Sequence, residues 1–251
     1  MKSYLKIFNI RSSSGGFTLI ELMIAMALTT IVVSAAGFGL VTMTDNNKKA
    51  EAKTQRRIEL SRASDFIMDE IRMARRINRT DTTIANGTTV TLSNVVTSSG
   101  LSLSDLGSYG TIILYLEIPI TSTITGNCPT GTSRAGLPPS NFDRVVYDIR
   151  TNTSTWLSPR TINRYGRIPG NDGKIDPCSN PAVSEALVDS ISNTDINTSN
   201  PISCNLPAVI SGTEGFYACV NGRMVDLYLR SKVPQSEDYN LSGKGFSRIA
   251  P

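Results

Sequence analysis

Histidine is absent from this chain of 251 residues. Its absence excludes Ser-His-Asp and Cys-His catalysis, HExxH zinc sites and histidine proton shuttles. The sequence also has no GxSxG motif and no phosphate-binding glycine loop. We therefore predict that the protein is not an enzyme, has no catalytic residue and needs no cofactor.

Aromatic residues and net charge are also scarce. Aromatic residues make up 6% of the chain, with one tryptophan, and the formal net charge is +4. A charge this small over this length is not typical of a nucleic-acid binder, so nucleic acid is not an expected partner. Many Ser, Thr and Asn residues with few aromatic ones favour a secreted or surface-exposed, β-rich domain.

Charged residues are almost missing from residues 17–43, a run of 27 residues with Glu21 as its one charge. As a helix this run would extend about 40 Å, which is enough to span a bilayer. Residues 1–16 carry three basic residues and no acid, so they should stay in the cytoplasm and leave the rest outside. A secretory signal cut near Ser34-Ala35-Ala36 is the less favoured alternative, because such signals have shorter apolar cores without an acid.

The junction Gly15-Gly16-Phe17-Thr18-Leu19-Ile20-Glu21 resembles the class III signal of type IV prepilins and type II secretion pseudopilins. The resemblance implies that a membrane-embedded prepilin peptidase cuts between Gly16 and Phe17 and then N-methylates Phe17. It divides the chain into a cleaved leader, a membrane-spanning assembly helix, an amphipathic second half of that helix and a β-rich head outside the cytoplasm. The corresponding ranges are 1–16, 17–44, 45–79 and 80–251.

Glu21 is costly inside a membrane, because an unpaired carboxylate in hydrocarbon is strongly disfavoured. The resemblance implies that it neutralises the α-amino group of Phe17 in a neighbouring subunit during filament assembly. The alternative is that Glu21, one turn from the mature end, extends its carboxylate to the lipid headgroups. The glycines at positions 37 and 39 fit either close helix packing or local loosening of the helix on assembly.

No proline precedes Pro119, so the helix can continue beyond the membrane. An apolar stripe at spacings of three and four predicts that it reaches Ile77 and packs on the head. Residues 46–79 hold ten basic and five acidic residues. Contact with DNA or lipid headgroups is possible in principle for such a segment, but the interleaved acids favour a solvated face that forms salt bridges to adjacent subunits. The stripe consists of Leu60, Ala63, Ile67, Ile71, Ala74 and Ile77.

The head is predicted to be an antiparallel sheet, which with the helix gives an α+β, type IV pilin-like fold. Residues 80–111 should form loops and an edge strand. The Asn221-Gly222 pair between two β-branched runs is a strong hairpin signal. The predicted strands are Thr111–Ile118, a hairpin of Arg144–Arg150 with Ser154–Ser158, and a hairpin of Phe216–Val220 with Arg223–Arg230.

All four cysteines lie in the head. In an oxidising compartment an even number of cysteines predicts two disulfides, and four cysteines allow three pairings. We prefer Cys128–Cys178 with Cys204–Cys219. No metal site is expected: the segment with Asn171, Asp172 and Asp176 only weakly resembles a calcium loop, because Lys174 interrupts it.

The VVYDIRTNTSTWLSPR segment is similar to a strand pair of PilW-like minor pilins and J-type pseudopilins, and RRIELSRASDFIMDEIRMARRI resembles the second half of their helix. The resemblance implies a minor pilin that helps to initiate or decorate a type IV pilus. The first alternative is a type II secretion pseudopilin, and the second is a ligand-binding adhesin at the filament tip. The implied partners are other pilins, through the helix, and the prepilin peptidase. The implied location is the inner membrane, single pass, and then the filament at the cell surface.

Overall fold

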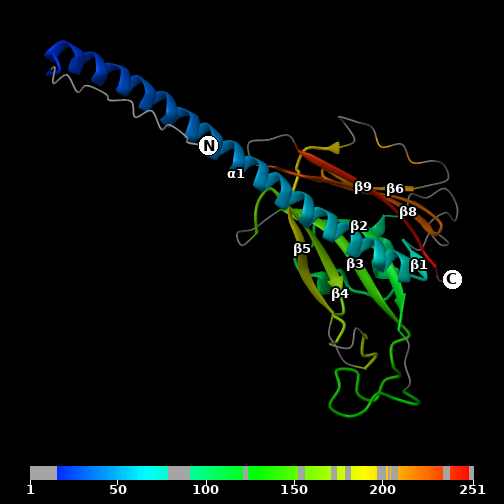
Figure 1. Cartoon of the computed structure of the whole chain (residues 1–251). Helices are drawn as coiled ribbons and strands as arrows, with labels where there is room; N and C mark the ends of the chain where they lie inside the picture. Colours follow the sequence, from blue (N-terminus) through cyan, green and yellow to red (C-terminus); the bar gives the residue numbers. More distant parts are fainter. Residues whose placement is uncertain are drawn as a thin grey trace, which may run out of the picture. The chain divides into compact units, whose positions relative to one another are not determined.

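The computed structural model divides into two compact units, residues 1–50 and 51–251, and helix α1 (Leu19–Met73) contributes to both. Each unit is described separately below, with the elements labelled as in Figure 1. The structure describes residues 16–78, 91–120, 124–151, 156–170, 174–178, 182–196, 202, 204, 209–233 and 238–248.

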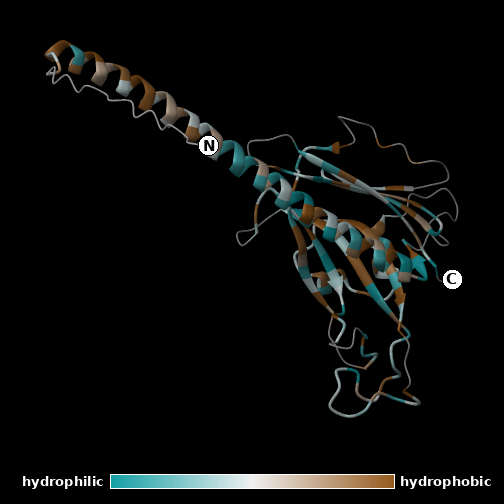
Figure 2. Cartoon of the chain, viewed as in Figure 1, coloured by the Kyte–Doolittle hydropathy of each residue, from teal (hydrophilic) through white to brown (hydrophobic). Residues whose placement is uncertain are grey.

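The first unit consists, in its described part, of residues 16–50, and all of them are exposed. In Figure 2 the ribbon of this part of α1 is coloured mostly brown, for hydrophobic residues, as the sequence predicts. The hydroxyl groups within the run donate to the carbonyl four residues earlier, as in Thr29 to Ala25 at 2.7 Å and Ser34 to Thr30 at 2.7 Å. These bonds satisfy polar groups inside the helix itself, which is what a helix in an apolar solvent requires.

The second unit is a curled antiparallel sheet that packs against the C-terminal part of α1, and it confirms the predicted α+β fold. The sheet has nine strands in the described residues, in the order β1-β2-β3-β4-β5-β8-β7-β6, with β9 paired to β8. The strands are β1 (Arg76–Ile77), β2 (Thr111–Pro119), β3 (Phe142–Thr151), β4 (Arg160–Gly166), β5 (Val183–Ile191), β6 (Val209–Thr213), β7 (Phe216–Asn221), β8 (Met224–Ser231) and β9 (Tyr239–Phe246).

The sheet curls along its strand order. In the middle of that order, strands β5 and β8 meet at the single register pair Ile191 and Ser231. The curl brings the end strand β6 back to β2, where the Ser211 hydroxyl of β6 donates to the carbonyl of Ile113 at 2.6 Å. Ile113 lies at the bulge of β2, where a register shift separates Ile112 from Leu114. Because of that bulge, Ile113 and Leu114 both face the core that contains α1.

Helix α1 ends at Met73, four residues before the predicted end at Ile77. The backbone N–H of Arg75 donates to the Glu117 carbonyl and that of Asn78 to the Tyr115 carbonyl, both at 2.8 Å. Pairing with β2 therefore replaces the last helical hydrogen bonds, while Ile77 stays buried as the stripe predicts. Asn78, at φ 48°, supports the change of direction and accepts the Tyr115 N–H on its side-chain oxygen.

Two other predicted elements differ from the structure. Residues 92–98 form helix α3 (Leu92–Ser98) and residues 103–106 form the short 3-10 helix η2 (Leu103–Leu106), where loops and an edge strand were expected. Their apolar side chains pack against Tyr115 and Val146, on the face of the sheet opposite α1. Burial on that second face is what makes this segment helical. Residues 80–90 of the predicted loop region lie outside the described part.

Of the two predicted hairpins, the second forms with a shifted turn, and the first is wrong in its second strand. β3 pairs with β4 (Arg160–Gly166) instead of with the predicted strand Ser154–Ser158. Residues 156–158 are not in a strand, and 154–155 lie outside the described residues. In the second hairpin Asn221 pairs with Met224, so that the two-residue turn is Gly222-Arg223. Gly222 has φ 57° and Arg223 does not have a positive φ, the pattern of a type II′ turn with glycine at its first central position.

The helix and sheet are joined by a buried polar network centred on Glu70 of α1. Glu70 accepts hydrogen bonds from Arg164 of β4 at 2.7 and 3.0 Å, and from the hydroxyl of Tyr147 of β3. Burial raises the pKa of Tyr147, and the Glu70 charge raises it further. Burial alone would lower the pKa of Arg164, but its hydrogen bonds to Glu70 and the charges of Glu70, Tyr147 and Asp143 together outweigh this and the pKa is raised. Every charged atom of the network is therefore paired.

Strand β9 can lie directly on α1 because two of its residues are glycines. A Cβ added to Gly243 would stand 2.9 Å from the Met68 side chain, and one added to Gly245 would stand 2.9 Å from Ile71. Past β9, the Ser247 hydroxyl donates to the Ala74 carbonyl near the end of α1. The C-terminal strand thus satisfies a carbonyl that the helix leaves open.

The head contains two disulfides, Cys128–Cys178 and Cys204–Cys219, the same pairs that the sequence analysis prefers. The first links the β2–β3 connection to the β4–β5 connection. The second links the segment before β6 to β7. Each joins a loop to a distant segment, which limits the entropy of the unfolded chain.

Replacing Glu70 with alanine should lower the free energy of unfolding by about 3–5 kcal/mol, because Arg164 would stay buried without a partner. Urea unfolding of the full chain in detergent, followed by far-UV circular dichroism, measures this change. Asp69→Ala is the matched control: Asp69 pairs with Arg72 on the exposed face at 2.5 Å, and its loss should cost less than about 1 kcal/mol. Equal losses for the two variants would contradict the anchoring role of Glu70.

Replacing both cysteines of one bridge with serine should destabilise the head, and the loss should rise slowly with the length of the loop that the bridge closes. The bridges span 15 and 50 residues. Loop entropy predicts losses of about 3 kcal/mol for Cys204–Cys219 and about 4 kcal/mol for Cys128–Cys178. The same urea assay provides the comparison, and a parent-like midpoint for either double variant would show that its bridge does not stabilise the fold.

Candidate functional site

The predicted processing and assembly site lies at the start of helix α1. Gly16, Phe17 and Thr18 precede the helix in non-helical conformation, and Leu19 is its first residue. Phe17 is 86% exposed. The bond between Gly16 and Phe17 therefore lies in an exposed segment that precedes the helix.

Glu21 and Thr18 form a capping box. The Thr18 N–H and hydroxyl donate to Glu21 Oε2 at 2.9 and 3.0 Å, and the Glu21 N–H donates to the Thr18 hydroxyl at 3.3 Å. Thr18 is thus the N-cap of α1 and Glu21 its third residue, the positions that a capping box requires. Its acid also lies at the positive end of the helix dipole.

The capping box uses only one of the two carboxylate oxygens of Glu21. Oε2 accepts both bonds from Thr18, whereas Oε1 of Glu21 accepts none from the described residues. The box also fixes the carboxylate at the helix start instead of letting it rotate. One carboxylate oxygen is therefore held in place with no donor among the described residues.

Sequence analysis found Glu21 but missed Thr18. The signal was present, because Thr followed three residues later by Glu at the start of an apolar run is the capping-box pattern. The class III signal includes the same residues, and for this reason the sequence analysis assigned them no helix-start motif. Thr18 and Glu21 act together here as one structural unit.

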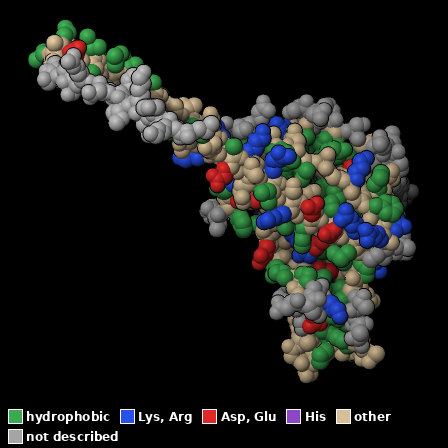
Figure 3. Space-filling view, viewed as in Figure 1, with side chains coloured by type: hydrophobic (Ala, Val, Ile, Leu, Met, Phe, Trp, Pro, Cys, Tyr) green, Lys and Arg blue, Asp and Glu red, His purple; other side chains and the backbone are tan. Residues whose placement is uncertain are grey.

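Several basic residues of the segment 51–78 form ion pairs within the chain. Arg56 contacts Asp189 at 2.9 Å and Glu59 at 2.5 Å, and Arg75 contacts Glu117 at 3.1 Å. On the face shown in Figure 3, basic and acidic side chains are intermingled over the head. These internal pairs use charges that the sequence analysis assigned to neighbouring subunits.

The weak calcium candidate lies mostly outside the described residues, which do not include Asn171 and Asp172. Asp176 is described, and its Oδ1 accepts the Cys178 N–H at 2.8 Å beside the first disulfide. Within the described part of the chain, no three Cys, Asp or Glu side chains form a group that could hold a metal ion. Asp176 has a structural role in this turn.

Comparison with known proteins supports the same N-terminal segment. Residues 11–41 match the family described as the prokaryotic N-terminal methylation motif. No curated protein and no solved structure matches the chain. Helix α1 is long and apolar enough to cross a membrane, and its apolar window is not buried within the structure. Together these findings support a type IV pilin-like or pseudopilin subunit, a structural protein anchored by a single membrane-spanning helix.

Thr18→Val should weaken the start of helix α1, because valine keeps the shape of threonine but cannot accept the Glu21 N–H. Amide hydrogen exchange in micelles should become about fivefold faster over residues 18–22, in line with the loss of an N-cap. Thr18→Ser is the control and should exchange like the parent chain. Unchanged exchange in the valine variant would contradict the capping box.

Proposed function

We propose that this protein is a minor pilin: a subunit that joins a type IV pilus through helix α1 and presents its head on the filament. The methylation motif of residues 11–41, together with the exposed, apolar first part of α1, carries this proposal. A head with long disulfide-linked connections favours a minor component over the subunit that builds the shaft. The similarity to PilW-like minor pilins and J-type pseudopilins supports the same choice.

The proposed maturation begins in the inner membrane. Prepilin peptidase cuts the Gly16–Phe17 bond and methylates the new amino group of Phe17, while the head lies outside the cytoplasm. The new α-amino group carries a positive charge close to the membrane surface. Such a charge is the natural partner for a carboxylate in an apolar surrounding.

Assembly then depends on Glu21. Its Oε2 is used by Thr18 and its Oε1 is open, so that a neighbour's Phe17 amino group can bind without breaking the capping box. Charge neutralisation favours insertion of a helix only when a partner is present, which gives assembly its selectivity. Because Glu21 is present, the subunit can accept another subunit and need not be the last one in the filament.

A type II secretion pseudopilin is the second candidate, because the methylation motif supports it equally. A strain lacking the gene separates the two functions. Loss of pili or twitching with normal secretion of exoproteins supports the pilus role, and the reverse supports the pseudopilus.

Intact-mass and N-terminal analysis of membrane-extracted protein tests maturation. The expected chain lacks residues 1–16 and begins with N-methyl-Phe17. A terminus near Gly37, as after a signal-peptide cut, or an uncleaved Met1 would remove the basis of the proposal.

Glu21→Ala tests the assembly role. The variant should keep a folded head with both disulfides but should be incorporated into filaments at least about tenfold less than the parent, because the inserted ammonium loses its partner. Thr18→Val is the matched control: it loses the cap but keeps the charge and should assemble better than Glu21→Ala. Normal incorporation of Glu21→Ala, measured by immunoblotting of sheared filaments, would refute the charge pairing.

A further inference from the structure

Three arginines near the start of β3 and the end of β4 take no part in the proposed maturation and assembly steps. Arg144 lies in β3, Arg167 follows the last residue of β4, and Arg134 lies in the connection from β2 to β3. Each of them is partly exposed. We call these three residues the arginine cluster.

Strand pairing places Arg144 beside Arg167. In the β3–β4 ladder Val146 is opposite Tyr165, and the same antiparallel register, continued to the next pair on that face, brings Arg144 opposite Arg167. On its other side Arg144 is opposite Glu117 of β2. Like charges in directly opposite positions of two strands destabilise the pairing.

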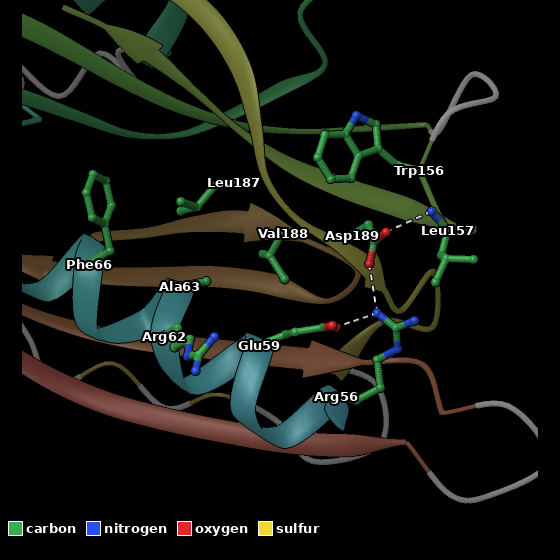
Figure 4. A pocket seen from close by; sticks show the side chains of 10 residues that line it. All are labelled: Arg56, Glu59, Arg62, Ala63, Phe66, Trp156, Leu157, Leu187, Val188 and Asp189. Carbon is green, nitrogen blue, oxygen red and sulfur yellow. Dashed lines mark hydrogen bonds and ion pairs between the residues drawn. The ribbon is translucent and has the colours of Figure 1, made fainter. Parts of the chain in front are cut away.

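The glutamate opposite Arg144 is used by other residues. Glu117 is buried, and its two oxygens accept hydrogen bonds from Arg75 and from the hydroxyl of Tyr115, both at 3.1 Å. Arg144 forms no hydrogen bond and no ion pair with any described residue, and its Nε is buried without an acceptor. Arg56 shows the usual arrangement, in which the guanidinium group contacts two carboxylates (Figure 4).

Packing holds the guanidinium group of Arg144 in place. Its Cζ lies 4.9 Å from the centroid of the Phe142 ring, and the Cζ of Arg75 lies 4.3 Å from the same centroid. Gly100, which follows helix α3, is also close, since a Cβ at that position would stand 3.8 Å from Nη2 of Arg144. A guanidinium group that stacks on an aromatic ring keeps its donors in one orientation, which lowers the entropic cost of binding a ligand.

Arg134 and Arg144 both act on Arg167. Burial lowers the pKa of Arg167, and the charges of Arg134 and Arg144 lower it further. The carboxylates of Asp143 and Asp176 act in the opposite direction but do not reverse the shift. Asp143 stays 3.7 Å from the Nε of Arg167, which is beyond hydrogen-bond distance, and the Nε of Arg134 is buried without an acceptor. The guanidinium groups therefore have more donors than the neighbouring acids accept.

The region around the cluster stays positive when the neighbouring described acids are counted. Five arginines and four acids lie there, a net charge of +1. They are Arg75, Arg76, Arg134, Arg144, Arg167, Asp105, Glu117, Asp143 and Asp176.

Phosphate is the anion that best matches these donors. A phosphate monoester carries a charge of about −1.5 to −2 at neutral pH and has three strong acceptor oxygens, so that it can bind more than one guanidinium group at once. Each planar guanidinium group offers two parallel N–H donors to such an anion. A carboxylate has one charge and two oxygens, and it would satisfy fewer of these donors.

We propose that Arg144, Arg167 and Arg134 form a binding site for a phosphate group, with Arg144 at its centre. The group is either free phosphate or a phosphate monoester carried by a larger molecule, because both present the same oxygens. The proposal concerns the head alone and does not depend on the role of helix α1 in assembly.

Isothermal titration calorimetry of the full chain in a non-ionic detergent tests the proposal. Inorganic phosphate is the probe, and sodium chloride keeps the ionic strength constant. The parent should bind phosphate saturably, with a Kd of about 1 mM or lower. Arg144→Gln should weaken binding by about tenfold or more, because it removes the central donor. Its urea unfolding without phosphate should match that of the parent, since Arg144 has no ion pair with a described residue to lose.

Arg248→Gln is the matched control. Arg248 is exposed and forms no ion pair with a described residue, but it lies beside Arg72 of α1, so this variant should bind phosphate like the parent. Arg134→Gln is a second variant that should also weaken binding. The proposal is overturned by a folded parent that does not bind phosphate, by equal binding to Arg144→Gln and the parent, or by an equal loss in Arg248→Gln.

Two further ligands identify the chemistry of the site and its source. Acetate should bind at least about tenfold more weakly than phosphate, and equal affinity would overturn the assignment to phosphate. Glycerol phosphate is a monoester with the same three free oxygens. Tighter binding of glycerol phosphate than of inorganic phosphate supports a group carried by a larger molecule, and the reverse order supports the free ion.

Discussion

The apolar first part of helix α1 has no cover within its own chain, and the rest of the account depends on this constraint. Fifteen large apolar side chains between Phe17 and Met43 are exposed. At about 1.5 kcal/mol or more for each, leaving them in water costs roughly 20 kcal/mol, which exceeds the net stability of a typical domain. The cover must therefore come from a bilayer or from the helices of other subunits. The motif for N-terminal methylation at the start of this helix supports the proposed order, in which the bilayer covers the helix first and the helices of other subunits cover it later.

Two glutamates of α1 show how one helix serves two surroundings. Glu70 is buried in the head and fully paired with Arg164 and Tyr147, so it fixes the helix to the sheet and has nothing left to offer a partner. Glu21 is exposed, is held by Thr18 through one oxygen and keeps the other open. The first carboxylate contributes stability, and the second is the one for which we propose a role in assembly.

Much of this architecture could be predicted from local sequence patterns. The apolar run, the stripe from Leu60 to Ile77, the strand before Pro119 and the hairpin near Gly222 depend on periodicity and turn chemistry, which act over short distances. The end of the helix could not be predicted, because Asn78 and Arg75 bond to β2, a strand some 40 residues further along the chain. Helix α3 was missed for a similar reason: it exists because a second apolar face of the sheet needs cover. The capping box was predictable from Thr18 and Glu21 alone, and the approach of Arg144 to Arg167 was not, since it depends on the pairing of β3 with β4.

The most direct test of the central claim asks what covers the apolar part of α1 in the cell. A photo-reactive residue at Leu28 reports the immediate surroundings of the helix. The account predicts adducts with lipid in the membrane fraction and with the apolar helix of another methylation-motif protein in the filament fraction. A soluble extracellular chain that begins after Met43 and forms neither adduct would contradict it.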